Sequence, residues 1–168
     1  MLPNKALQQT GLSVAPLLLA PAAERRYGPD RDMSSELQAA LLRTTVSEDL
    51  SAALKDIVDG LDPSDATTVP VLLRFVEEHP DLDFGAPGPL VHFVERFYGR
   101  GYEAELLTSL ARSPTSHTLW MLNRIINGTA EPAQRARLLE VLRSSAEHPS
   151  ANQIVRETAL DFLRHQNE

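Results

Sequence analysis

The pattern that decides the fold lies in residues 113–128, SPTSHTLWMLNRIING. Ser113 is a residue type that caps helices. Pro114 suits the first helical turn, because the backbone N–H that proline lacks would have no hydrogen-bond partner within the helix there. Apolar residues then recur at steps of three and four, which places them on one helix face; they are Leu119, Leu122 and Ile126. The stretch therefore predicts an amphipathic helix that ends at Gly128.

The same pattern recurs on both sides of this helix. Each predicted helix has one apolar face and starts near a capping residue or a proline. Ser47 is expected to cap the helix that follows it, and Gly60 to end that helix in the left-handed conformation. The predicted starts lie near Ser47, Val69, Pro89, Tyr102, Pro114, Pro132 and Ser150.

No stretch shows the alternation of apolar and polar residues that is typical of a strand. The helix starts are about 12 to 22 residues apart, and the short loops between them favour antiparallel hairpins. Two helices make a unit of about 40 residues, which is the period of HEAT and armadillo repeats. We therefore predict an all-α fold of antiparallel helical hairpins. They form a short HEAT/armadillo-like solenoid or an irregular bundle of about 7–8 helices.

Residues 1–33 differ in composition from the rest of the chain. Residues 12–23 resemble the apolar core of a secretory signal, with Lys5 before it. Pro16 and Pro21 interrupt this core, which argues against a signal. The run is also too short to span a bilayer, since that takes about 20 apolar residues.

Two other interpretations of this segment stay open. In the first, translation starts at Met33. In the second, residues 1–33 are a disordered or mis-annotated leader. Residues 4–10 resemble translated flanking sequence of integron gene cassettes, which favours an annotation overrun. On either interpretation, residues 34–168 form a single α-helical domain.

Composition limits the possible functions. The chain has 168 residues, the length of one domain, and it has no cysteine, which excludes disulfides and cysteine-based metal sites. Its formal net charge of −7 argues against binding to nucleic acid or to an anionic membrane. We predict a cytoplasmic protein whose partner is another protein.

Candidate catalytic groups are few. The five histidines show no i, i+4 pair of the kind that zinc sites use, and the loop at residues 85–88 lacks the Lys-Ser/Thr of a phosphate-binding loop. An enzyme would need a pocket that gathers His92, His117 and Glu95. We expect instead that His92 lies at a helix–helix boundary and Trp120 in the core. The sequence predicts no catalytic residue, no cofactor and no metal.

The charge distribution is more informative. Residues 47–83 hold ten acidic side chains and only two basic ones, Lys55 and Arg74. Several acids fall in last helical turns, where the helix dipole disfavours them, which indicates a surface kept for a partner. A solvated acidic face is the alternative. The candidate partner-binding residues are Asp56, Asp59, Asp62, Asp65, Glu77 and Glu78. An antiparallel hairpin would place the first four and the last two at opposite ends, roughly 15 Å apart.

Two segments carry a family resemblance: residues 90–97, LVHFVERF, and residues 113–127, SPTSHTLWMLNRIIN. With the helix between them they resemble the middle of small all-helical immunity proteins of bacterial polymorphic-toxin systems. The similarity covers roughly residues 65–145. It implies a cytoplasmic antidote that binds a cognate toxin domain and blocks it by occlusion, without chemistry of its own.

Two function hypotheses follow from these observations. The first is an immunity-type inhibitor whose acidic face meets a basic toxin such as a nuclease, with charge complementarity speeding the encounter. The second is a helical-repeat adaptor or scaffold that binds a peptide or protein in its groove. Both are non-enzymatic, and both need no cofactor.

Overall fold

The computed structural model describes residues 31–85 and 87–166. This part of the chain is all-helical and contains no strand, which confirms the predicted fold class. Its eight helices are α1 (Arg31–Thr44), α2 (Leu50–Asp59), α3 (Thr68–Glu78), α4 (Pro89–Glu95), α5 (Tyr102–Arg112), α6 (Ser116–Gly128), α7 (Pro132–Ala146) and α8 (Gln153–Gln166).

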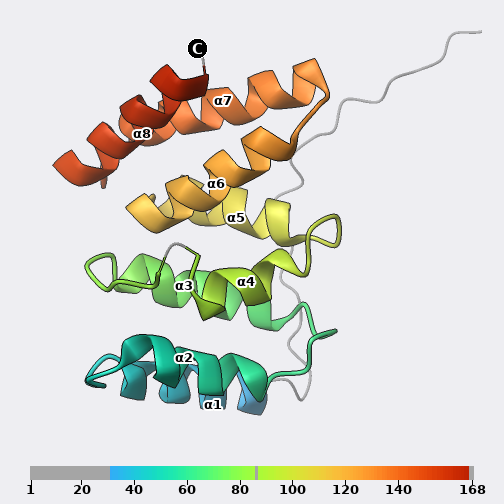
Figure 1. Cartoon of the computed structure of the whole chain (residues 1–168), viewed down its shortest axis with the longest axis vertical. Helices are drawn as coiled ribbons and strands as arrows, with labels where there is room; N and C mark the ends of the chain where they lie inside the picture. Colours follow the sequence, from blue (N-terminus) through green and yellow to red (C-terminus); the bar gives the residue numbers. More distant parts are fainter. Residues whose placement is uncertain (1–30, 86, 167–168) are drawn as a thin grey trace, which may run out of the picture.

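The helices pair into four antiparallel hairpins that stack as layers, with α1/α2 at one end and α7/α8 at the other (Figure 1). Along the stack, the odd-numbered helices pack on one another from α1 to α7. In the other row, α2 packs on α4 and α6 packs on α8. No comparable packing joins α4 to α6, so the second row has a gap at its middle.

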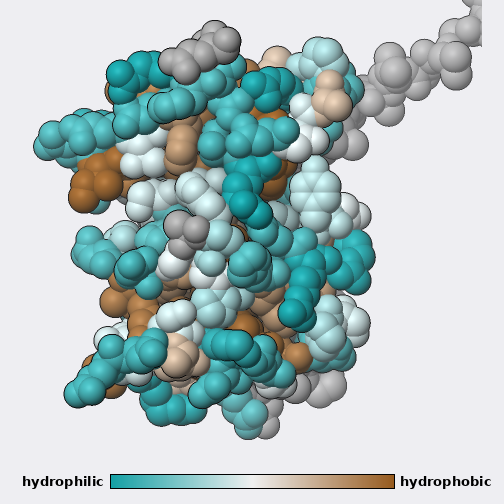
Figure 2. Space-filling view, viewed as in Figure 1, coloured by the Kyte–Doolittle hydropathy of each residue, from teal (hydrophilic) through white to brown (hydrophobic). Residues whose placement is uncertain are grey.

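One continuous core runs through all the layers. Residues with no exposed surface come from successive helices and include Leu41, Leu54, Leu72, Leu106, Leu122, Leu142 and Ala159. Each apolar face thus packs against its own hairpin and against the next one, as the three- and four-residue periodicity predicts. The outer surface in Figure 2 is mostly hydrophilic, with apolar colour gathered between the layers.

For α2, the predicted cap is wrong, while the predicted end at Gly60 is right in position and wrong in conformation. Asp49, not Ser47, caps it, because the Asp49 carboxylate accepts the backbone N–H of Ala52 at 2.9 Å. Gly60 has a φ of −83°, which is right-handed, so it does not supply the left-handed ending that was expected. An ordinary hydrogen bond from the Gly60 N–H to the Ile57 carbonyl, at 3.0 Å, closes this helix.

Two other helices start later than predicted. In α6, the backbone N–H of Thr115 donates to Thr118 Oγ1 at 2.9 Å, and the N–H of Thr118 donates to Thr115 Oγ1 at 3.1 Å. This reciprocal capping box is buried, and it places the helix start at Ser116. In α8, the side chain of Asn152 accepts the N–H of Val155 at 2.9 Å, so Ser150 is not its cap.

The predicted domain start lies inside a helix. Because α1 begins at Arg31, the boundary between residues 33 and 34 falls within it. The signal-like core at 12–23 and the cassette-like residues 4–10 lie outside the described residues. The interpretations of the leader, including the start at Met33, stay predictions.

The loop between α3 and α4 closes against α6. Phe84 is buried and meets both Phe75 and His117 edge-on, at ring-centroid distances of 5.7 and 5.0 Å. Its backbone N–H donates to His117 Nε2 at 3.4 Å. A Cβ on Gly88 would lie 1.5 Å from the Phe84 carbonyl oxygen, so the loop folds back on itself only with glycine at that position.

The half-buried His117 makes stability depend on pH. Burial lowers the pKa of His117, and the nearby Asp83 carboxylate only partly opposes this effect. The unfolded chain therefore takes up a proton first as the pH falls, so stability is full above about pH 6.5 and is lost below it. We expect the free energy of unfolding of the wild type to fall more between pH 7.5 and 5.5 than that of His117→Gln. Urea titrations at both pH values measure this difference, and an equal loss in the two proteins would refute it.

Candidate functional site

Four of the six predicted acidic residues lie at one edge of the stack. Asp56 and Asp59 are in the last turn of α2, and Asp62 and Asp65 are in the loop that leads to α3. The first three are exposed and Asp65 is half-buried. We call these four residues the acidic edge. Figure 1 places the α2–α3 loop and the C-terminal end of α3 at opposite edges, so the acidic edge is separate from Glu77 and Glu78, as predicted.

Two carboxylates of the acidic edge also hold the loop in shape. Asp62 accepts the backbone N–H and the hydroxyl of Ser64 at 2.8 and 2.7 Å, and these bonds lower the pKa of Asp62. Asp65 accepts the N–H and hydroxyl of Thr67 at 2.9 and 2.6 Å. This is ordinary turn chemistry for aspartate, so two of the acids that suggested a partner have a local role as well.

The other two carboxylates differ in their partners. Asp59 forms an ion pair with Lys55, four residues earlier on α2. No hydrogen bond or ion pair engages Asp56 within the residues that the structure describes. Its carboxylate acts on Lys55 only through space, where it helps to raise the pKa of Lys55.

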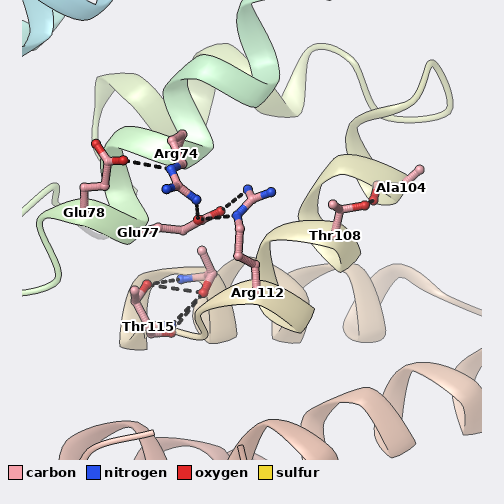
Figure 3. A network of polar contacts seen from close by, with 8 residues as sticks. Arg74, Glu77, Glu78, Ala104, Thr108, Arg112 and Thr115 are labelled. Carbon is pink, nitrogen blue, oxygen red and sulfur yellow. Dashed lines mark hydrogen bonds and ion pairs between the residues drawn. The ribbon is translucent and has the colours of Figure 1, made fainter. Parts of the chain in front are cut away.

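The prediction that Glu77 belongs to a partner-binding surface is wrong. Its side chain is only 2% exposed and accepts two hydrogen bonds from Arg112 of α5, from Nε at 2.8 Å and from Nη2 at 2.6 Å (Figure 3). Arg74 Nη1 adds a third contact at 3.3 Å. The packing of α3 on α5 covers this carboxylate, so its partner comes from within the chain.

The side chain of Glu78 is exposed, but it also has a partner within the chain. Arg74 donates from Nε to the Glu78 carboxylate at 2.7 Å, within α3. Arg74 and Arg112 therefore bind both acids at this end of α3. The charges of Glu77 and Glu78 are therefore compensated within the chain, whereas Asp56 of the acidic edge has no ion-pair partner among the described residues.

The three residues of the enzyme hypothesis are not brought together. His92 is exposed on α4, which corrects its expected place at a helix boundary. His117 packs against Phe84, and Glu95 forms an ion pair with Arg124. Over the described ranges, no group of three or more histidine and carboxylate side chains is placed to hold a metal ion.

A cleft that the sequence did not reveal lies where α4 and α6 part. It has a volume of about 390 Å³ and is lined by Glu95, Tyr98, Tyr102, Arg124, Ile125 and Asn127. The Glu95 carboxylate bridges it by accepting from Arg124 Nε at 2.5 Å and from Nη2 at 3.0 Å. The guanidinium of Arg124 also lies over the ring of Trp120, 4.9 Å from its centroid.

The lining of this cleft contains a buried hydroxyl without a partner. Tyr102 is 1% exposed, and its hydroxyl makes no hydrogen bond with any described residue. Burial raises the pKa of Tyr102 well above its usual value, and the Glu95 carboxylate adds to the shift. The group therefore stays protonated and is available as a donor.

Sequence reasoning missed the cleft because its walls come from separate segments. Glu95 and Arg124 are 29 residues apart, and no local spacing rule brings the two segments that carry them together. Trp120, predicted to lie in the core, is half-buried, packs against the core and also lies under the guanidinium of Arg124. The one usable signal was an Arg four residues after a Trp on the same helix, a spacing that allows the guanidinium to stack on the indole.

Comparison of the chain with models of protein families, with curated proteins and with solved structures gives no match. The resemblance to immunity proteins therefore stays a prediction. Among the described helices, none combines the length and the apolar character that crossing a bilayer requires.

The buried ion pair between α3 and α5 generates an asymmetric prediction. Arg112→Met leaves the buried Glu77 carboxylate with only its longer contact to Arg74, and we expect a loss of about 3 kcal/mol in the free energy of unfolding. Glu77→Met leaves two arginines that water can reach, each 44% exposed, and should cost about 1 kcal/mol. Urea unfolding of both variants gives the comparison. A larger loss for Glu77→Met would contradict the assignment of the buried charge.

Proposed function

We propose that this chain is a non-enzymatic protein-binding module of the immunity type, which occludes a basic bacterial toxin domain through a helical surface. The observation that carries the proposal is the acidic edge. Four carboxylates lie within residues 56–65, and the only basic residue among them or next to them is Lys55. This charge projects from one edge of a rigid stack and is not neutralised by neighbouring layers.

Electrostatics gives the acidic edge a definite role in such a complex. Complementary charge speeds the encounter of two proteins and selects among partners, while apolar and hydrogen-bonded contacts slow their separation. Exposed charges act over about 10 Å at moderate ionic strength. The acidic edge would therefore orient a basic partner before contact is made.

The ionisable groups that an enzyme would need support the non-enzymatic part of the proposal. Glu77 and Glu95 are each held by an arginine through two hydrogen bonds. His117 is packed between aromatic and backbone groups of the α3–α4 loop. These side chains are engaged in contacts between the helices and do not gather in one pocket.

The proposal predicts a charge-dependent association rate. The triple variant Asp56→Asn, Asp62→Asn, Asp65→Asn removes three charges, and the asparagine oxygens keep the acceptors that hold the α2–α3 loop. The proposal predicts that a neighbouring gene encodes the partner toxin domain, and that domain is immobilised for surface plasmon resonance. We expect the association rate at low ionic strength to fall roughly tenfold, with a smaller difference at high salt.

A matched control removes the same charge from the other end of the stack. The variant Glu140→Gln, Glu147→Gln, Glu157→Gln changes exposed residues of the α7/α8 layer. It should leave the association rate within about twofold, because its charges lie far from the acidic edge. An equal effect of the two variants, or association that does not depend on salt, would overturn the electrostatic part. Failure of the wild-type chain to restore growth of cells expressing the toxin domain would overturn the immunity part.

The adaptor hypothesis remains as a second candidate because of the cleft between α4 and α6. A partner held there would contact hydrogen-bonding groups and not a charged surface. The two candidates therefore differ in their salt dependence and in the residues that they use.

A further inference from the structure

We propose that the cleft between α4 and α6 binds a short extended peptide segment of a partner protein, with the Tyr102 hydroxyl donating a hydrogen bond to one of its backbone carbonyls. The inference deepens the protein-binding function proposed above and rests on it. The feature that points to a ligand is a buried donor with no acceptor at the wall of a cleft. Such a group costs stability when it is left unsatisfied.

The backbone fixes the start of α5, where Tyr102 lies. Tyr102 is the first residue of α5 and follows a tight turn in which Gly99 and Gly101 have φ values of +70° and +111°. The Glu103 carboxylate accepts the N–H of Gly99 at 2.7 Å and closes that turn. The turn therefore holds the Tyr102 main chain beside the cleft, and the burial of its ring restricts the side chain.

The other polar groups of the cleft are donors as well. The ion pair with Glu95 uses Nε and Nη2 of Arg124 and leaves Nη1 for another acceptor. Asn127 accepts from Gln166 through Oδ1 at 2.6 Å, which leaves its amide N–H groups for a ligand. Three donors around one cleft call for a ligand rich in acceptors, as a polypeptide backbone is.

Charge selects a peptide over a small anion. Glu95 and Arg124 neutralise each other across the cleft, so its walls carry no net positive charge to hold a carboxylate or a phosphate. A neutral carbonyl satisfies the donors without leaving a charge unpaired. The buried side chain of Ile125 and the half-exposed ring of Tyr98 add apolar walls for a side chain of the same segment.

The size of the cleft agrees with such an occupant. A volume of about 390 Å³ lies in the range of sites for small ligands and accommodates two to three residues of an extended chain. An extended chain advances about 3.3 Å per residue, so adjacent carbonyls can reach different donors. The segment would complete the hydrogen bonds that the gap between α4 and α6 leaves unmade.

The test uses the full chain and a random heptapeptide pool displayed on phage. Peptides selected on the wild type are synthesised with a fluorescent label, and their affinities are measured for the wild type and for Tyr102→Phe. We expect at least a tenfold weaker affinity for the variant, since it lacks only the hydroxyl. A thioamide at the carbonyl that Tyr102 contacts, a weaker acceptor, should weaken binding to the wild type and not to the variant.

Two further measurements separate the inference from its alternatives. Tyr102→Phe should leave the Tm of the free protein unchanged or higher, because it removes an unsatisfied group; a lower Tm would show that the hydroxyl is satisfied internally and would overturn the inference. Peptide affinity should change by less than about twofold with salt, because the cleft is neutral. Selection of no peptide, or equal affinities of wild type and variant, would also overturn it.

Failure of this inference and failure of the proposed function are distinguishable. If the basic partner still binds Tyr102→Phe with a salt-dependent rate and no peptide is selected, the cleft inference alone fails. If neutralising the acidic edge has no effect on that rate while peptides bind the cleft, the immunity-type proposal fails and the cleft inference stands.

Discussion

Burial of apolar helix faces between successive hairpins is the constraint on which this structure depends. A single hairpin would leave its apolar face open on each side of the layer, and only stacking covers it. The odd-numbered helices satisfy this requirement without interruption from α1 to α7. Between α3 and α5 the same contact also covers the Glu77 carboxylate, so Arg112 must accompany it there. The ion pair follows from the packing of the layers and does not drive it.

The row of even-numbered helices satisfies the constraint only in part. The short α4 and the C-terminal half of α6 do not pack closely, and a paired glutamate and arginine span the space between them. An ion pair of this kind is exposed enough to keep its hydration, so it costs little and leaves room for a ligand. In this gap polar groups take the place of apolar contacts between the two helices.

The sequence predicted features that arise from neighbouring residues and missed those that arise from distant ones. Helix order and the all-α class follow from local periodicity, which is why the predicted starts at Pro89, Tyr102 and Pro132 agree with the structure. Ser47 failed as the cap because the nearby Asp49 carboxylate takes that role, and Gly60 ends α2 as predicted but in the right-handed conformation. Glu77 failed for a different reason: its partner is 35 residues away, and only the packed layers bring the two together.

The alternation of loops between the two edges of the stack has a further consequence. The α2–α3 loop and the α4–α5 turn emerge at the same edge (Figure 1). The acidic edge and the residues around the α4–α5 turn that line the cleft therefore lie at one edge of the stack, on adjacent layers. A single polypeptide that carries a basic tract next to an extended segment could engage both at once. Binding of this polypeptide at one site would raise its effective concentration at the other. Two weak contacts on consecutive repeats would then give one tight, bivalent interaction.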